Sequence, residues 1–474
     1  MTEAADTSTP ARPSRAPRRA PDDLPFTFVD TALLAAIDAA RPEPDWLRED
    51  RAAALSRFGA LPVEGNRLYT PYVDLRAASL DGAGPYLSTA DAAALPDEGA
   101  HGPDELTSGQ LELAEDEVAA ASIDPAAAAA GVRLMTLGQL LRDDPTLARQ
   151  LLVDDPVLPA DEKFAWLGRA AWTQGMVLYV PAGVRVERPV VLRWAVGAPR
   201  TLIGRTLLVL EDGAEASVVE ELVASDGVEP GAQALLSLTT EIRLGAHARL
   251  ALGSLQETGP DQIVLQQRVA RVGEAADLRW ALAQLGARLV RSRVDNVLAG
   301  DRGVVEQVEI VFGAGDQFHD LTSYTHHVGR DTTGQLLSKG VLLDRARTYM
   351  KGLITIDKTA IGTDSFLGEF GMNLSRAARS VAIPSLEIDQ PDCRRAAHSS
   401  AVGPIDESQL FYLESRGIDP DDARKFIVLG FLEPVVARVP LEDARDRLRE
   451  ALEAKWAAGL APAEMAAAGA ASAA

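Results

Sequence analysis

The sequence contains a single cysteine, Cys393, among 474 residues. One thiol cannot form a disulfide within the chain, and it cannot supply the four thiolates of a typical structural zinc or iron–sulfur site. A disulfide framework and an all-thiolate metal site built from this chain alone are therefore excluded. A reducing compartment suits such a chain, and we expect it to be cytoplasmic.

Aromatic residues and basic charge are also scarce. Aromatic side chains make up 5% of the chain, and 69 acidic residues outweigh 47 basic ones, which gives a net charge of −22. A strongly acidic protein lacks the basic surface that nucleic acids and anionic membranes attract, so neither partner is expected. No run of about 20 apolar residues occurs, so no transmembrane helix is predicted.

Several signals of targeting and catalysis are missing as well. Residues 1–24 contain arginines but no apolar core, so we predict a disordered tail and no secretory signal. A transit peptide is the alternative, and Glu3 and Asp6 count against it. No phosphate-binding GxxxxGK[ST] or GxGxxG occurs in a strand–turn–helix setting, and GxSxG and HExxH are absent. If ATP hydrolysis belongs to the function, a partner must supply it.

Short β-branched or alternating runs separated by glycine extend from about residue 175 to 395. Four of these glycines, Gly213, Gly245, Gly273 and Gly300, recur at intervals of 32, 28 and 27 residues. A repeat near 30 residues is typical of the stacked coils of a β-solenoid. An antiparallel sandwich or barrel is the alternative that the pattern leaves open.

Two short helices are predicted after the β region. Asp406 can cap the first, with Gln409 three residues on, and Gly417 supplies a left-handed stop. The second begins with Asp419 as its cap and Pro420 at its first helical position. Its apolar residues recur at helical spacing, at Ala423, Phe426, Ile427, Gly430 and Phe431. Such a helical pair on the end of a β body is more naturally a docking element than a catalytic one.

Several ordered segments also resemble a known family. They are GMVLYVPAGVRVERPV (175–190), RTLLVLEDGAEASVVEE (205–221), HHVGRDTTGQLLSKGVLLDRARTYMKGLITI (326–356), IPSLEI (383–388) and HSSAVGPIDESQLFYLESRGI (398–418). Together they are similar to the SufB/SufD proteins, the scaffold paralogues of the Suf iron–sulfur cluster assembly machinery. The resemblance covers roughly residues 165 to 440.

The resemblance implies a mainly β fold, a right-handed parallel β-helix flanked by N-terminal and C-terminal helical regions. It implies a non-catalytic scaffold that pairs with a SufB-like paralogue and binds a SufC-like ABC-type ATPase. An iron–sulfur cluster would pass through the complex transiently, with no cofactor bound stably by this chain alone. A homodimer in isolation is compatible with it. The expected regions are a tail (1–24), a helical or irregular region (25–174) with a helix near 110–121, a β-helix core (175–395), a helical docking region (396–458) and an Ala-rich tail (459–474).

Within the family, two positions favour the D-type paralogue. Ser399 follows the motif His398, where the B-type scaffold carries a glutamate. Glu369 or a neighbour stands in the region where the B-type carries a functional cysteine. A B-type paralogue remains the alternative.

His398 is the main candidate site residue, just before the Gly403–Pro404 turn. By resemblance it occupies the family's motif histidine near the heterodimer interface, and imidazole is a plausible iron ligand. Cys393 lies five residues upstream and is a second interface candidate. D-type relatives commonly carry a cysteine two residues before the histidine, where this chain has Ala396. Cys393 is otherwise an ordinary small thiol.

A second group of histidines comprises His319, His326 and His327, with Asp316 and Asp320 nearby. In an extended strand His326 and His327 point to opposite faces, so structural roles are favoured over a shared metal. The predicted partner-docking residues belong to the helical pair: Phe411, Tyr412, Arg416, Gly417, Phe426 and Phe431.

A carbohydrate-active or isomerase enzyme on a β-helix is the alternative from another class. It would need a groove lined by aromatic side chains and paired carboxylates for acid and base chemistry. The low aromatic content disfavours this alternative.

Overall fold

The computed structural model describes residues 24–80, 82–87, 106–197, 199–225, 231 and 233–471. The expected N-terminal tail lies outside these residues except for Leu24. The same is true of residues 88–105 within the acidic irregular segment.

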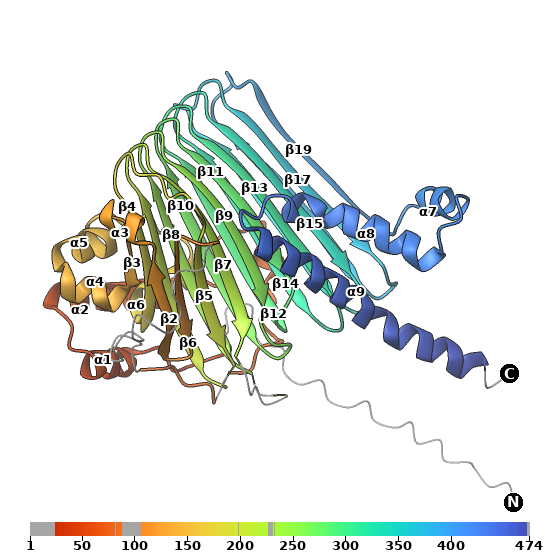
Figure 1. Ribbon diagram of the computed structural model, residues 1–474, viewed down its shortest axis with the longest axis horizontal. Helices are drawn as coiled ribbons and strands as arrows, with labels where there is room; N and C mark the ends of the chain where they lie inside the picture. The colour runs from red at the N-terminus through yellow and green to blue at the C-terminus, as the bar shows by residue number, and fades with distance from the viewer. Residues whose placement is uncertain are drawn as a thin grey trace, which may run out of the picture.

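Two mainly parallel sheets, which we call A and B, form the body of the protein (Figure 1). The strands of sheet A are β3 Arg133–Thr136, β4 Gln174–Val180, β6 Thr201–Leu210, β8 Leu235–Leu244, β10 Ile263–Val272, β12 Leu289–Leu298, β14 Phe318–His327, β16 Arg347–Ile356 and β18 Arg379–Ile388. Those of sheet B are β1 Gly109–Ala114, β2 Glu117–Ile123, β5 Val190–Val196, β7 Glu215–Ala224, β9 Arg249–Glu257, β11 Asp277–Gln284, β13 Val304–Gly313, β15 Thr333–Leu342, β17 Asp364–Asn373 and β19 Arg395–Gly403.

From β4 onward, successive strands alternate between the two sheets. Sheet A is ordered β18-β16-β14-β12-β10-β8-β6-β4-β3, and sheet B is ordered β19-β17-β15-β13-β11-β9-β7-β5-β1-β2. Each strand from β4 to β17 therefore pairs in parallel with the strand one coil further on, which is the pattern of a β-solenoid. The β-helix predicted from the glycine repeat is confirmed, and the antiparallel sandwich is excluded.

The repeated glycines lie at one corner of the coils, for two different physical reasons. Gly213 has φ 69°, a left-handed conformation that costs glycine little. Gly300 is needed for close approach, since a Cβ there would lie 2.1 Å from the backbone nitrogen of Glu274 in the preceding coil. Coils are then linked at this corner by backbone hydrogen bonds such as His247 N–H to Glu274 O, 2.7 Å.

Apolar side chains fill most of the space between the two sheets. Every second residue of each strand points inward, and these include Trp194, Trp280, Leu252 and Leu278, all at most 2% exposed. The Trp280 indole N–H donates to the Asn296 side chain at 2.9 Å, which satisfies its buried donor.

Helices near the N-terminus cover the outer face of sheet A. Phe164 and Leu167 of α6 pack in one buried cluster with Leu207 of β6 and with α2. The contact with β8 is close, because a Cβ on Gly168 would meet the Thr239 hydroxyl at 2.0 Å. The helical elements of this region are α1 Thr31–Ala40, α2 Asp45–Ala60, η1 Thr70–Tyr72, α3 Pro125–Ala129, α4 Leu137–Asp143, α5 Pro145–Arg149, η3 Gln150–Asp154 and α6 Lys163–Ala171.

A segment that we call the strap, residues 63–73, continues across sheet A to the late coils. Tyr69 is fully buried, stacks on Tyr324 at 6.1 Å between ring centroids, and donates its hydroxyl to Gly352 O at 2.8 Å. Glu64 of the strap lies 3.5 Å from Arg291 and 3.8 Å from Lys351, in a buried network of charges. Buried charges are tolerated when they are paired, so this network fixes the strap to the sheet.

The C-terminal helices cover part of the outer face of sheet B. They are α7 Glu407–Glu414, α8 Pro420–Val436 and α9 Glu442–Ala471. Val428, Leu432 and Val435 of α8 pack with Ile310 of β13 and Leu448 of α9 in one buried cluster. Figure 1 shows α8 and α9 lying across the strands, with α7 beyond the sheet.

Two expectations about local structure are corrected. The helix expected near 110–121 is the antiparallel pair β1–β2, in which Leu111 and Leu113 are buried. Strands therefore begin inside the region expected to be helical or irregular (25–174), and β19 extends to Gly403 in the region expected to be helical and to dock partners. The Ala-rich end is helical through Ala471, in keeping with the high helix propensity of alanine.

Among the described residues, no helix is both long and apolar enough to cross a membrane.

Candidate functional site

The solenoid ends with two strands that each have a neighbour on one side only. β18 closes the strand order of sheet A, and β19 closes that of sheet B. Ile388 on β18 and Val402 on β19 are 45% and 42% exposed, which is unusual for large apolar side chains. Unpaired strand edges bind further strands readily, so this open end is a candidate interface.

His398 lies on the inner face of the last coil. Its register partner is Leu367, which belongs to a buried cluster between the sheets. His398 itself is exposed because no further coil covers it. The imidazole is therefore presented to whatever meets the open end.

Cys393 has different surroundings. It precedes β19 and is partly buried against an apolar cluster that includes Ile354, Ile356 and Leu367. Cys393 packs as a small apolar side chain.

A row of acidic and hydroxyl side chains, interrupted by Leu282, follows the inner face of sheet B to the open end. Successive register partners are Glu220, Ser254, Leu282, Glu309, Ser338, Glu369 and Ser400. Glu220 is paired with Arg268 at 2.8 Å, whereas Glu309 accepts from Ser292 at 2.8 Å and from Gln284 at 3.1 Å. Burial raises the pKa of Glu309.

Glu369, one coil below the open end, is the more unusual carboxyl. It is 1% exposed, and Ile383 N–H donates to it at 2.8 Å. Burial raises the pKa of Glu369 to about 8 despite that hydrogen bond. The space for it is made by Gly352, where a Cβ would lie 2.9 Å from the Glu369 carboxyl oxygen. The sequence drew attention to this position but gave no signal of its burial.

The second histidine group is divided between the two faces of β14. His319 and His327 are fully buried on the inner face of β14, while His326 is on the outer face and pairs with Asp357 at 3.0 Å. Burial lowers the pKa of His319 to about 3 and that of His327 to about 4. Asp316 pairs with Arg345, and Asp320 with Lys351. The predicted opposite orientation of His326 and His327 is confirmed, and the described residues hold no group of three or more His, Cys, Asp or Glu side chains placed to bind a metal.

The helical hairpin α7–α8 forms as its capping residues predict. Asp406 caps α7, Asp419 caps α8 and Gly417 has φ 88°. Ser408 N–H donates to the Asp406 side chain, and Gln409 completes no reciprocal cap. Phe411, Tyr412 and Phe426 are 74%, 57% and 58% exposed. The Arg416 guanidinium lies 4.9 Å from the Tyr412 ring centre.

The side of α8 that faces the solenoid differs from the predicted stripe. Val428, Leu432, Val435 and Val436 are buried with Ala423, whereas Phe426 and Gly430 are exposed. Phe431, expected to dock a partner, is instead partly buried against the solenoid, with the Lys339 ammonium 4.5 Å from its ring centre. The exposed aromatic surface therefore consists of Phe411, Tyr412 and Phe426.

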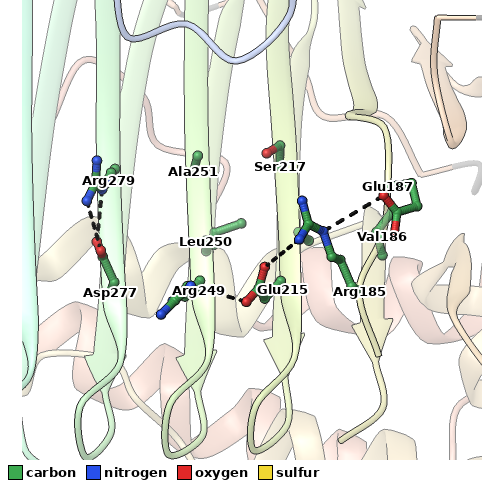
Figure 2. A pocket seen from close by; sticks show the side chains of 11 residues that line it. Arg185, Val186, Glu187, Glu215, Ser217, Arg249, Leu250, Ala251, Asp277 and Arg279 are labelled. Carbon is green, nitrogen blue, oxygen red and sulfur yellow. Dashed lines mark hydrogen bonds and ion pairs between the residues drawn. The ribbon is translucent and has the colours of Figure 1, made fainter. Parts of the chain in front are cut away.

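Charged residues line a groove of about 470 Å³ on the uncovered part of sheet B (Figure 2). Glu215 lies 3.8 Å from Arg185 and 3.4 Å from Arg249, and Asp277 lies 3.0 Å from Arg279. The acidic and basic side chains of the groove thus pair with one another, and its lining contains no aromatic side chain. Glu215 and Asp277 are both paired with arginines, unlike the free acid and base pair that the enzyme alternative requires.

A larger cavity of about 650 Å³ lies on the outer face of sheet A, beside the strap. Its lining includes Leu68 of the strap, Tyr324 and His326 of β14, and Glu387 of β18. We call it the strap pocket.

The molecule is thus a parallel β-helix with an open end, an exposed histidine there, and an aromatic helical hairpin beside its late coils. Residues 194–431 match the family model described as "SUF system FeS cluster assembly, SufBD core domain". The chain belongs to the SufBD family of iron–sulfur cluster assembly proteins.

Relatives agree with this assignment. The iron–sulfur cluster assembly protein SufD of Bacillus subtilis (strain 168) is 30% identical over 317 residues, which cover 66% of this chain and 71% of that protein. A SufBD family protein of Staphylococcus epidermidis is 27% identical over 316 residues, covering 66% of this chain and 67% of the relative. A relative from Staphylococcus saprophyticus has the same identity and coverage. The family resemblance predicted from the sequence motifs is confirmed. The match to SufD agrees with the prediction that the chain is most like the D-type paralogue.

Proposed function

We propose that this chain is the non-catalytic, D-type scaffold of a cluster assembly complex. It would pair through its open end with a SufB-like paralogue and carry a SufC-like ATPase on the α7–α8 hairpin. A cluster would form transiently at the paired end, and the chain would hold no cofactor stably by itself. The single cysteine and the acidic surface fit a reducing, cytoplasmic setting.

The observation that carries the proposal is the open end itself. A solenoid end leaves backbone groups of two strands unpaired, and a partner with the same cross-section can continue both sheets. The inner faces of β18 and β19 carry no Asp, Glu, Lys or Arg side chain that would repel a further strand. On β19 the inner face includes His398 and Ser400. A paralogue of the same fold matches such an end better than an unrelated globular protein.

The hairpin supports a second partner. Phe411, Tyr412 and Phe426 expose more than half of their surface in a chain that is only 5% aromatic. Aromatic side chains carry much of the free energy at protein interfaces. Figure 1 shows the hairpin beside the late strands, on the side of β15 to β19. An ATPase bound there would act close to the open end.

The test is anaerobic co-expression of this chain with an ABC-type ATPase and a Cys-bearing paralogue encoded beside it, followed by native mass spectrometry. A heteromer that contains all three chains is the expected result. A monomer or homodimer that binds neither partner would contradict the proposal and favour the enzyme alternative.

A further inference from the structure

The floor of the strap pocket is formed by two neighbouring rows of the outer face of sheet A. Asp295, Tyr324 and Leu353 are successive register partners in one row. Val297, His326, Thr355 and Glu387 are successive partners in the other. The second row ends at Glu387 on the edge strand β18, beside the strand position that a partner would occupy.

Most charges in the pocket are already neutralised. Arg293 lies 2.8 Å from Asp295, 3.0 Å from Glu162 and 3.0 Å from Asp161. The His326 imidazole lies 3.0 Å from Asp357. Within the described residues, Glu387 and Arg67 are the two charged lining groups with no ion-pair partner. Glu387 is on the edge strand, whereas Arg67 is on the strap.

The apolar surface of the pocket is exposed beside these charges. Leu68 is 58% exposed, and Leu353 and Val297 are in the floor. The Tyr324 ring is held from two directions, by Tyr69 stacking and by Arg293 at 4.4 Å from its centre. A floor that includes Leu353 and Val297, with a carboxylate at the edge, suits a side chain that has both an apolar stem and a cationic head.

We propose that the strap pocket receives an arginine or lysine side chain from the paralogous scaffold strand that pairs with β18. A residue in line with the His326–Thr355–Glu387 row falls beside Glu387, about 4.8 Å away. Opposite charges at adjacent strand positions attract, and a long stem from that position reaches back over Thr355 toward Leu68. The inference rests on the proposed pairing at the open end and adds the flank of the interface and the chemistry of its anchor.

The test is the dissociation constant between this full chain and its purified paralogue, measured for single variants by biolayer interferometry. Glu387→Gln removes the edge charge and is expected to weaken binding at least tenfold, and Leu68→Ser about threefold. Arg67→Ala is the matched control from the same pocket and is expected to change binding less than twofold. Raising the salt concentration should weaken wild-type binding more than that of Glu387→Gln, because the charge pair is screened. Glu387 and Leu68 are exposed, so unchanged melting temperatures will show that the variants fold.

Two results would overturn the inference while leaving the proposed function intact. One is wild-type binding that Glu387→Gln alters less than twofold. The other is a loss with Arg67→Ala that exceeds the loss with Glu387→Gln, which would mean that the occupant is anionic. If the wild-type chain does not bind its paralogue at all, the proposed pairing fails and the inference falls with it.

Discussion

The Glu369 carboxyl accepts a hydrogen bond from the backbone N–H of Ile383 at 2.8 Å, so a side chain of sheet B is joined to the last strand of sheet A. Gly352 leaves the space that this contact needs. The carboxyl is therefore part of the packing that closes the last two coils, directly beneath the surface on which His398 lies.

Glu369 should make the stability of the protein fall as pH rises. Its pKa is about 8 in the folded chain, against an ordinary value of 4.5. Between these values the unfolded chain has lost a proton that the folded chain keeps, so folding is disfavoured increasingly with pH. Glu369→Gln should stabilise the protein by about 2 kcal/mol more at pH 8 than at pH 6. Denaturant unfolding at the two pH values measures the difference, with the outward-facing Glu306→Gln as control. Parallel pH profiles for wild type and Glu369→Gln would contradict the expectation.

The buried histidines should destabilise the fold on the acid side. His327 bonds to Thr332 at 2.8 Å and to Ser365 at 2.9 Å, and burial lowers its pKa to about 4 from 6.5. The stability that neutral His327 contributes is complete above pH 6.5. It is lost as pH falls toward 4, because the histidine of the unfolded chain takes up a proton first. We expect the free energy of unfolding to fall by about 1 kcal/mol for each pH unit below pH 6. His327→Gln should remove this fall. Denaturant unfolding of wild type and His327→Gln between pH 4 and pH 7 measures the difference, and equal slopes for the two proteins would contradict the expectation.

The exposed aromatic surface should be required for ATPase binding and dispensable for folding. Replacing Phe411, Tyr412 and Phe426 together by serine should abolish capture of the ATPase, while the melting temperature stays unchanged because all three are exposed. Phe431→Ala is the contrasting variant. It packs against the solenoid, so its loss should cost about 2 kcal/mol of stability. Native mass spectrometry and thermal unfolding separate the two effects, and ATPase capture by the triple variant would refute the docking surface.

His398 should matter for cluster formation and not for assembly. His398→Ala is expected to lower the amount of cluster formed by the anaerobic heteromer, measured by absorbance and iron content, with the same subunit composition. His247→Asn is a suitable control, since His247 is an exposed corner residue with φ 60° and asparagine tolerates that conformation. An unchanged cluster yield in His398→Ala would remove the residue from the site.

The strap should loosen when its buried charges are unbalanced. Lys351 lies 2.6 Å from Asp320 and 3.8 Å from Glu64, and all three are buried. Lys351→Met leaves two acids with Arg291 as their remaining cation, which should cost about 3 kcal/mol. Limited proteolysis should then cut the strap near Leu68 faster than in wild type. Lys358→Met, at an exposed position, provides the comparison.

The sequence predicted those features that local chemistry determines. The caps Asp406 and Asp419, the stop at Gly417 and the glycine repeat all follow from backbone preferences of single residues, and each occupies its expected place. The family motifs gave the β-helix, whose parallel pairing joins residues about one coil apart.

Other features depend on contacts that no short segment contains. Leu111 and Leu113 alternate with polar residues, a pattern that suits a strand. The segment forms a strand and not the expected helix because it pairs with β2 and β5. Phe426 and Phe431 lie on one helix, and the position of β13 and β15 determines which is covered. Glu369 became a buried carboxyl because Gly352 and Ile383, distant in sequence, meet it.

The register between coils has a consequence for the dimensions of the molecule. From β12 to β18 the pairing runs without a shift over strands of ten residues. Each coil thus adds one strand spacing of about 4.8 Å along the axis and leaves the cross-section unchanged. The length of the solenoid therefore changes only by whole coils. A change in coil number would shift the α1–α6 region relative to the open end by multiples of that step while preserving the shape of the end that a partner meets.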